Sequence, residues 1–250
     1  MRRAARAVTA CFALACLAAG CAEVPQVPAM PGPFQTEQAP VATTVPAASD
    51  DGELSPYGFD VAERISVRVR NLGCFSLSTG SGFAIGPTTL VTNRHVVEDS
   101  AELALSTYDG RDVGVRAASI AELADLAVVR TDGELPAVPQ LASSDPERGD
   151  TITVVGYPQG GRLTATSGRI IARTTDPLHL NLGEVLVTDA VVEPGNSGSP
   201  ALDHRGRVVG VVYAMNAAGQ SFIVPVSTLV ELIDDDAAFA EVESGSHMCD

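Results

Sequence analysis

The sequence predicts an all-β protein built from two six-stranded antiparallel barrels, with a short C-terminal helix after the second barrel. Three observations lead to this prediction. Short apolar segments and turn residues form two series, a stretch without an apolar period separates the series, and the last apolar segment has helical spacing. An apolar fraction of 45% is ample for a core. Closing each half into a barrel would remove its exposed strand edges.

The first series of candidate strands, within residues 59–130, is assigned to an N-terminal barrel. Its strands are expected at 61–70, 80–85, 88–92, 102–106, 113–120 and 126–130. Residues 131–149 contain three prolines and two glycines and lack a sustained period, so they are predicted to link the two barrels.

The second series, within residues 150–225, is assigned to a C-terminal barrel. Its strands are expected at 151–156, 163–174, 185–192, 199–202, 208–213 and 221–224. Residues 225–233 have apolar side chains at helical spacing, so residues 226–250 are assigned to a helix and a tail.

Residues 1–21 have the features of a targeting segment. Three arginines lie within the first six residues, and the apolar run 7–19 that follows is too short to span a bilayer comfortably. The run ends in small residues before Cys21, which resembles the lipobox of bacterial lipoproteins, in which this cysteine is lipidated. Ala18 stands where a larger aliphatic residue is usual, so an ordinary cleaved secretory signal is the alternative.

Residues 22–58 are rich in proline and have no apolar period, so they are predicted to form an extended tether. We therefore expect a protein secreted across the cytoplasmic membrane and held at the cell envelope through a lipid on Cys21. Of the five cysteines, Cys74 and Cys249 remain after the targeting segment and the lipidated residue are set aside. A disulfide between these two is predicted for an oxidising compartment, and two free thiols are the alternative.

The net charge of −15 argues against binding to nucleic acid, because the chain has no basic patch to displace phosphate counterions. It indicates instead a soluble protein whose negatively charged surface repels other copies of the same chain. No ligand cluster has metal spacing, so neither a metal nor another cofactor is expected.

Three motifs indicate nucleophilic catalysis. Ser197 stands between glycines in the string G-N-S-G-S-P (195–200), on a predicted turn before an apolar strand. His95 lies in the string T-N-R-H-V-V, and Asp125 directly precedes an apolar run. A serine, a histidine and an aspartate in such contexts predict a catalytic triad. The alternatives are a buried structural histidine and an aspartate that merely begins a strand or caps a turn.

The same strings resemble the chymotrypsin-like serine proteases, and are closest to the bacterial trypsin-like and HtrA-like branches. The resemblance is carried by G-S-G-F-A-I (80–85), L-V-T-N-R-H-V-V (90–97), D-L-A-V-V (125–129) and G-N-S-G (195–198). The chain order His, Asp, Ser is that of this fold. Within the branch, V-G-Y-P-Q-G-G (155–161) resembles periplasmic acid-resistance proteases of high-GC bacteria. The resemblance covers roughly residues 62–235.

The resemblance implies a serine endopeptidase acting on polypeptides. Ser197 would be the nucleophile, His95 the general base and then acid, and Asp125 the group that orients the imidazole. The backbone N–H groups of Gly195 and Ser197 would form the oxyanion hole. The specificity pocket would have its base near Val191 and one wall along Val212, Tyr213 and Ala214. No acid stands at this base, so a small or apolar P1 residue is expected rather than Arg or Lys.

Two positions depart from the common string G-D-S-G-G-P. Asn196 replaces the aspartate, as in HtrA-like members, so activation by pairing with a freed N-terminus is not expected. Ser199 replaces the second glycine after the nucleophile, and its Cβ is a candidate to crowd the turn. Two alternatives therefore stay open: a catalytically impaired pseudoprotease that binds envelope partners, and an esterase that uses the same triad.

Overall fold

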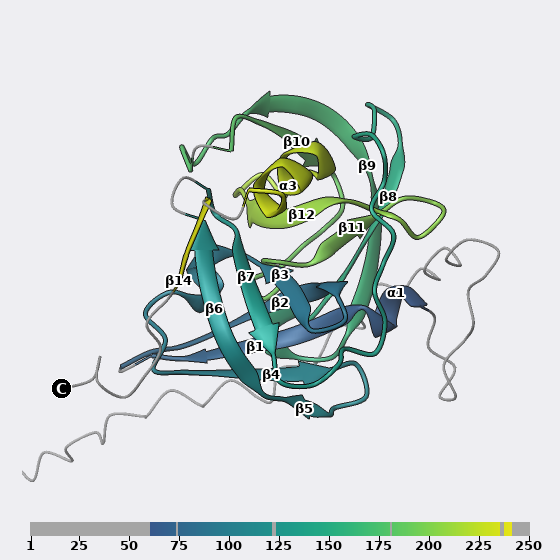
Figure 1. The fold of residues 1–250 in the computed structure, drawn as a ribbon. Coiled ribbons are helices and arrows are strands. Elements are labelled where there is room, and N and C mark those ends of the chain that lie inside the picture. The colour runs from purple at the N-terminus through teal and green to yellow at the C-terminus, as the bar shows by residue number, and fades with distance from the viewer. Residues whose placement is uncertain (1–60, 74, 122–123, 181, 236–237, 242–250) are drawn as a thin grey trace, which may run out of the picture. The chain divides into compact units, whose positions relative to one another are not determined.

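The computed structural model describes residues 61–73, 75–121, 124–180, 182–235 and 238–241 (Figure 1). The predictions for the targeting segment, the lipidated Cys21, the tether and the Cys74–Cys249 disulfide lie outside the described residues. No helix among the described residues is long and apolar enough to cross a membrane.

The N-terminal half forms an antiparallel sheet of eight strands in the order β14-β6-β7-β3-β2-β1-β4-β5. Its strands are β1 (Ser66–Leu72), β2 (Leu77–Gly86), β3 (Thr89–Thr92), β4 (Glu102–Thr107), β5 (Asp112–Val113), β6 (Val115–Ala121), β7 (Ala127–Thr131) and β14 (Phe239–Glu241). The last of these comes from the C-terminal end of the chain and pairs with β6 at the sheet edge. A closed barrel of six strands was expected in this half. The sheet instead has eight strands, has β14 and β5 at its two ends rather than closing, and draws on a distant segment.

The C-terminal half forms a closed barrel of six strands in the order β10-β13-β12-β11-β8-β9, as predicted. Its strands are β8 (Thr151–Gly156), β9 (Thr164–Thr175), β10 (Glu184–Thr188), β11 (Pro200–Leu202), β12 (Val208–Met215) and β13 (Ser221–Pro225). The predicted helix is present as α3 (Val226–Ile233), which lies beside β12 and β13 (Figure 1). The all-β class with its short C-terminal helix is therefore confirmed.

Short elements account for the other differences from the predicted strands. The first expected strand begins as the helix α1 (Val61–Arg64), and β1 follows it. The expected strand 113–120 is divided at Gly114, because β5 pairs with β4 whereas β6 pairs with β7. A four-residue helix, α2 (Arg94–Val97), and a 3-10 turn, η1 (Pro158–Gly160), were not predicted.

One hydrophobic core is shared by the two halves. It includes Ile65, Phe83 and Leu126 from the N-terminal half together with Val155 and Val211 from the barrel. Further clusters fill the interior of each half separately. Loops at the junction are therefore supported by packed strands on both sides, which is the setting that the predicted triad needs.

Candidate active site

His95 and Asp125 meet because the strands next to them are paired. β3 pairs with β7 with Thr92 opposite Ala127. His95 follows the end of β3, and Asp125 precedes the start of β7, so this register brings both residues to the same edge of the sheet. The two sequence motifs thus converge through one pair of neighbouring strands.

The contact between these two residues is close and doubly anchored. His95 Nδ1 lies 2.7 Å from Asp125 Oδ2, and the backbone N–H of His95 donates to Asp125 Oδ1 at 3.0 Å. The backbone carbonyl of Asp125 accepts a hydrogen bond from the side-chain amide of the buried Asn93 at 2.8 Å. A carboxylate accepts from Nδ1–H, so this geometry selects the tautomer that leaves Nε2 free to accept a proton.

Burial separates the roles of the two side chains. Asp125 is only 2% exposed, whereas the side chain of His95 is 43% exposed. His95 is therefore not the buried structural histidine of the alternative interpretation. Its Nδ1 is paired with a buried acid while much of the side chain is exposed, which is the arrangement of a base available to a substrate.

Ser197 lies on a turn that is attached to the N-terminal sheet. Its carbonyl accepts the N–H of Ser81 in β2 at 2.8 Å and lies 3.2 Å from the Cβ position of Gly80. That same Cβ position is in contact with the side chain of Val96, the residue after His95. The turn is thus packed on the strand that also supports α2. Among the described residues, no hydrogen bond joins Ser197 to His95, and such bonds are often long before substrate binds.

The residues before Ser197 form a tight turn with two available N–H groups. Asn196 N–H donates to the carbonyl of Glu193 at 2.9 Å, and Gly195 at the third position of this turn has φ = +100°. Proline at the second position and a positive φ at the third are typical of a type II turn. The N–H groups of Gly195 and Ser197 have no hydrogen-bond acceptor within the described parts of the chain.

Ser199 fits beside this turn because Gly156 has no side chain. Ser199 is fully buried, and its Oγ occupies the space that a Cβ at Gly156 would need. Its backbone N–H donates to the carbonyl of Asn196 at 2.9 Å, and its carbonyl accepts the N–H of Val212 at 3.0 Å. The extra Cβ therefore does not break the hydrogen bonding of the turn, although its hydroxyl has no partner among the described residues.

The predicted pocket residues have different exposures. Val191 is 62% exposed, Val212 and Tyr213 are buried, and Ala214 is half-buried on β12. The hydroxyl of Tyr213 donates to Asp176 Oδ1 at 2.9 Å, and burial raises the pKa of this tyrosine above its usual value. Tyr213 is thus held in the interior rather than facing an open pocket.

Asp176 was not predicted, although it holds the loop between β9 and β10. Its buried carboxylate accepts the N–H groups of Leu178 and Leu180 as well as the Tyr213 hydroxyl. The only local signal is the Asp-Pro pair, which indicates a turn and not a buried carboxylate. Its partner on β12 is distant in sequence, so only the fold identifies the contact.

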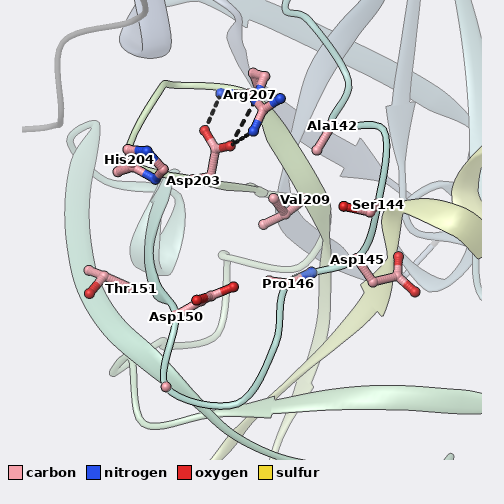
Figure 2. A pocket seen from close by; sticks show the side chains of 11 residues that line it. Ala142, Ser144, Asp145, Pro146, Asp150, Thr151, Asp203, His204, Arg207 and Val209 are labelled. Carbon is pink, nitrogen blue, oxygen red and sulfur yellow. Dashed lines mark hydrogen bonds and ion pairs between the residues drawn. The ribbon is translucent and has the colours of Figure 1, made fainter.

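A pocket of about 410 Å³ is lined by residues of the C-terminal barrel and of the segment before it, and none of these lining residues belongs to the predicted triad (Figure 2). It is lined by Ala142, Ser144, Asp145, Pro146, Gly149, Asp150, Thr151, Asp203, His204, Arg207 and Val209. Within it, Asp203 accepts hydrogen bonds from Arg207 Nε at 2.8 Å and from the backbone N–H of Arg207 (Figure 2). It accepts a further one from the backbone N–H of Arg205. Burial by itself would raise the pKa of Asp203, but the hydrogen bonds from Arg207 and Arg205 outweigh it and lower that pKa.

We expect the substitution Asp203→Asn to lower the free energy of unfolding at pH 7 by about 1 kcal/mol, because solvent screens this pair. A carboxyl whose pKa is lower in the folded state stabilises the fold above its unfolded pKa, and this contribution is lost as the pH falls through the folded pKa. The stability difference between wild type and variant should therefore be constant above about pH 5 and shrink below pH 3.8. Urea denaturation between pH 2.5 and 7 measures this, with Asp112→Asn as the exposed control. A difference that grows on acidification would contradict the assignment.

No group of three or more His, Cys, Asp or Glu side chains in the described part of the chain is arranged to hold a metal ion. The chemistry available at the junction is that of the His95–Asp125 pair and the two backbone N–H groups near Ser197.

These features define a fold of one closed six-stranded barrel and one eight-stranded sheet, with a histidine–aspartate pair beside a serine turn. The sequence matches the family described as trypsin-like peptidase domain over residues 80–211, and the chain belongs to this family. Two relatives are named as bacterial proteases. A probable periplasmic serine endoprotease DegP-like of Chlamydia trachomatis is 32% identical over 174 residues, covering 66% of this chain and 35% of that protein. The serine protease Do-like HtrA of Bacillus subtilis is 30% identical over 184 residues, covering 66% of this chain and 41% of that protein.

A solved structure matches over a larger share of the chain. The active form of the Rv3671c protease from M. tuberculosis superposes with a TM-score of 0.65 at 28% identity, covering 88% of this chain and 99% of that one. The chain thus spans well under half the length of the curated relatives quoted above and nearly the whole of this solved domain.

Proposed function

We propose that this protein is a serine endopeptidase that cleaves polypeptides through an acyl-enzyme, with Ser197, His95 and Asp125 as its triad. The observation that carries the proposal is the hydrogen bond of 2.7 Å between the exposed His95 ring and the buried carboxylate of Asp125. Membership in the trypsin-like peptidase family and the protease names of the relatives support it.

In the proposed reaction, His95 Nε2 takes the proton of Ser197 as Oγ attacks the scissile carbonyl. The buried Asp125 stabilises the imidazolium that forms and keeps the ring oriented. The free N–H groups of Gly195 and Ser197 then receive the oxyanion, and loss of one such donor typically costs about 3–4 kcal/mol in the transition state. His95 finally donates its proton to the leaving amine, and water repeats the sequence on the ester.

Three finer features are part of the proposal. The substrate side chain is small or apolar, since Val191 and Val212 are apolar and no acid was found at the expected base. The protein is secreted, which the periplasmic location named for relatives supports. A lipid on Cys21 anchors it to the membrane, and a disulfide links Cys74 with Cys249.

Labelling with a fluorophosphonate probe tests the catalytic proposal, because the probe phosphonylates only an activated serine. We expect the mature wild-type protein to be labelled and Ser197→Ala not to be labelled. We expect labelling of His95→Ala to be slower by at least about 10³-fold. His204→Ala is the matched control, since His204 lines the separate pocket, and it should react like wild type.

Cleavage of peptide and ester substrates by the same four proteins then separates peptidase from esterase activity. A wild-type protein that stays unlabelled at neutral and acidic pH under oxidising conditions would rule out an assembled triad. Hydrolysis of esters without any hydrolysis of peptides would replace the peptidase by an esterase.

A further inference from the structure

The turn that carries the two free N–H groups has every one of its backbone carbonyls occupied. The acceptors and their donors are Glu193 with Asn196 N–H, Pro194 with Gln159 N–H, Gly195 with Ser81 Oγ, Asn196 with Ser199 N–H, and Ser197 with Ser81 N–H. Three of these five bonds are external, because their donors belong to Ser81 and Gln159, which lie far from the turn in the sequence. External groups therefore fix which way its peptide planes face.

Ser81 provides two of the three external bonds. It is fully buried in β2, its hydroxyl donates to the carbonyl of Gly195 at 2.8 Å, and its backbone N–H donates to the carbonyl of Ser197 at 2.8 Å. The same hydroxyl accepts the N–H of Tyr157 at 2.9 Å, and the Ser81 carbonyl accepts the hydroxyl of Thr92 at 2.6 Å. Ser81 thus joins the N-terminal sheet, the end of β8 and the turn in one network that uses its hydroxyl, its N–H and its carbonyl.

Gln159 provides the third external bond and a side-chain contact. Its backbone N–H lies 2.5 Å from the carbonyl of Pro194, and its Nε2 donates to Glu193 Oε2 at 2.6 Å. Gln159 adopts φ = +55°, a conformation that is unfavourable for a residue with a side chain and is kept only where surrounding structure enforces it. The residue with this unfavourable backbone conformation is therefore the one that binds the carbonyl of Pro194 in the turn.

The direction of the Pro194–Gly195 peptide decides whether the oxyanion hole exists. In a trans peptide the carbonyl and the N–H point to opposite sides. While the Pro194 carbonyl faces Gln159, the Gly195 N–H faces away from Gln159 and stays unpaired. A flip of this peptide would replace a donor by an acceptor at the same place, and an acceptor repels an oxyanion.

We propose that Ser81 and Gln159 are positioning residues that lock this turn with the Gly195 N–H available, so that the oxyanion hole is formed before substrate binds. The proposal rests on the proposed peptidase function for its consequence in catalysis, but not for the conformation of the turn. Neither residue touches the reacting atoms. Gln159 acts through the carbonyl of Pro194, and Ser81 acts through the carbonyl of Gly195.

The first test compares Ser81→Ala with Ser66→Ala. Ser66 is an equally buried strand serine whose hydroxyl has only contacts of 3.4 Å, to the carbonyls of Ala62 and Val155. We expect Ser81→Ala to lower kcat by roughly 10- to 100-fold with KM within about twofold, because a preorganised donor acts mainly in the transition state. Ser66→Ala should stay within about twofold of wild type in both constants.

The second test reads the turn without any activity. In protein labelled with ¹⁵N-glycine, the amide resonance of Gly195 should shift or broaden in Ser81→Ala and stay at its wild-type position in Ser66→Ala. An unchanged Gly195 resonance in Ser81→Ala, or the same change in both variants, would overturn the proposal. A wild-type protein that no fluorophosphonate labels would refute the peptidase function instead, and the resonance comparison would still decide the role of Ser81.

A second variant, at the surface, keeps the proposal testable if Ser81→Ala does not fold. Gln159 is exposed, and Gln159→Glu places a second carboxylate next to Glu193 without changing the size of the side chain. The expected result is again a lower kcat and a displaced Gly195 resonance. The control is Gln140→Glu, at an exposed site in the linker. If Gln159→Glu keeps the kcat and the Gly195 resonance of its control, Gln159 has no part in holding the turn.

Discussion

The substitution Asp125→Asn is expected to lower kcat by about 10⁴ while the protein stays folded. The reason lies in how both oxygens of Asp125 are used. The backbone N–H of His95 donates to Oδ1, so in the variant this position keeps the amide oxygen. The amide NH₂ would then face Nδ1 of the ring. Nδ1 must then accept a hydrogen bond, the ring proton moves to Nε2, and the ring can no longer take the proton of Ser197.

Steady-state kinetics on a peptide substrate measure this loss, and the thermal transition shows whether the fold persists. Asp132→Asn is the control, because Asp132 is an exposed acid nearby in sequence whose ion pair is with Arg116. It should retain the wild-type kcat. Retention of more than about a tenth of kcat in Asp125→Asn would remove this carboxylate from the proposed role.

Gly198→Ala is expected to have the largest effect on folding among single substitutions near the turn. Gly198 has φ = +85°, and an added Cβ would overlap the carbonyl oxygen of Ser81 and lie 2.5 Å from Thr92 Oγ1. Backbone strain and overpacking of this kind together cost roughly 2–6 kcal/mol. Movement of the turn to relieve the overlap would also displace Ser197, so we expect activity to fall below detection.

Gly110→Ala separates the cost of backbone strain from the cost of overpacking in this prediction. Gly110 has a similar φ of +81°, but a Cβ there would have no neighbour within 4 Å. It should lose only the strain contribution, about 1–2 kcal/mol. Urea denaturation of both variants gives the comparison, provided that the slopes agree. Equal losses would mean that contact with Ser81 and Thr92 does not constrain Gly198.

Local sequence was sufficient to predict the residues that can be recognised from their neighbours in the chain. His95 follows a strand and Asp125 precedes one, and antiparallel pairing of β3 with β7 brings such ends together without further information. The alternation of apolar residues likewise identifies β1 and most of the barrel strands, because side chains in a strand face opposite sides in turn.

Residues that act across the fold could not be found in this way. The role of Ser81 depends on a carbonyl more than a hundred positions later in the chain, and that of Asp176 on a hydroxyl of a distant strand. Helix α2 has only four residues, which is too short for a helical period to appear. Tyr213 was assigned to a pocket wall by resemblance, whereas its hydroxyl is bonded to Asp176 in the interior.

The strand β14 makes the first half of the chain depend on its last described residues. Phe239–Glu241 cover the outer edge of β6, whereas every other strand of that sheet lies before residue 132. Because synthesis proceeds from the N-terminus, the half that is made first is completed last, after the entire barrel has been synthesised. Until then β6 presents an unpaired edge, which is where a newly made chain is open to pairing with a second copy or to capture by a chaperone.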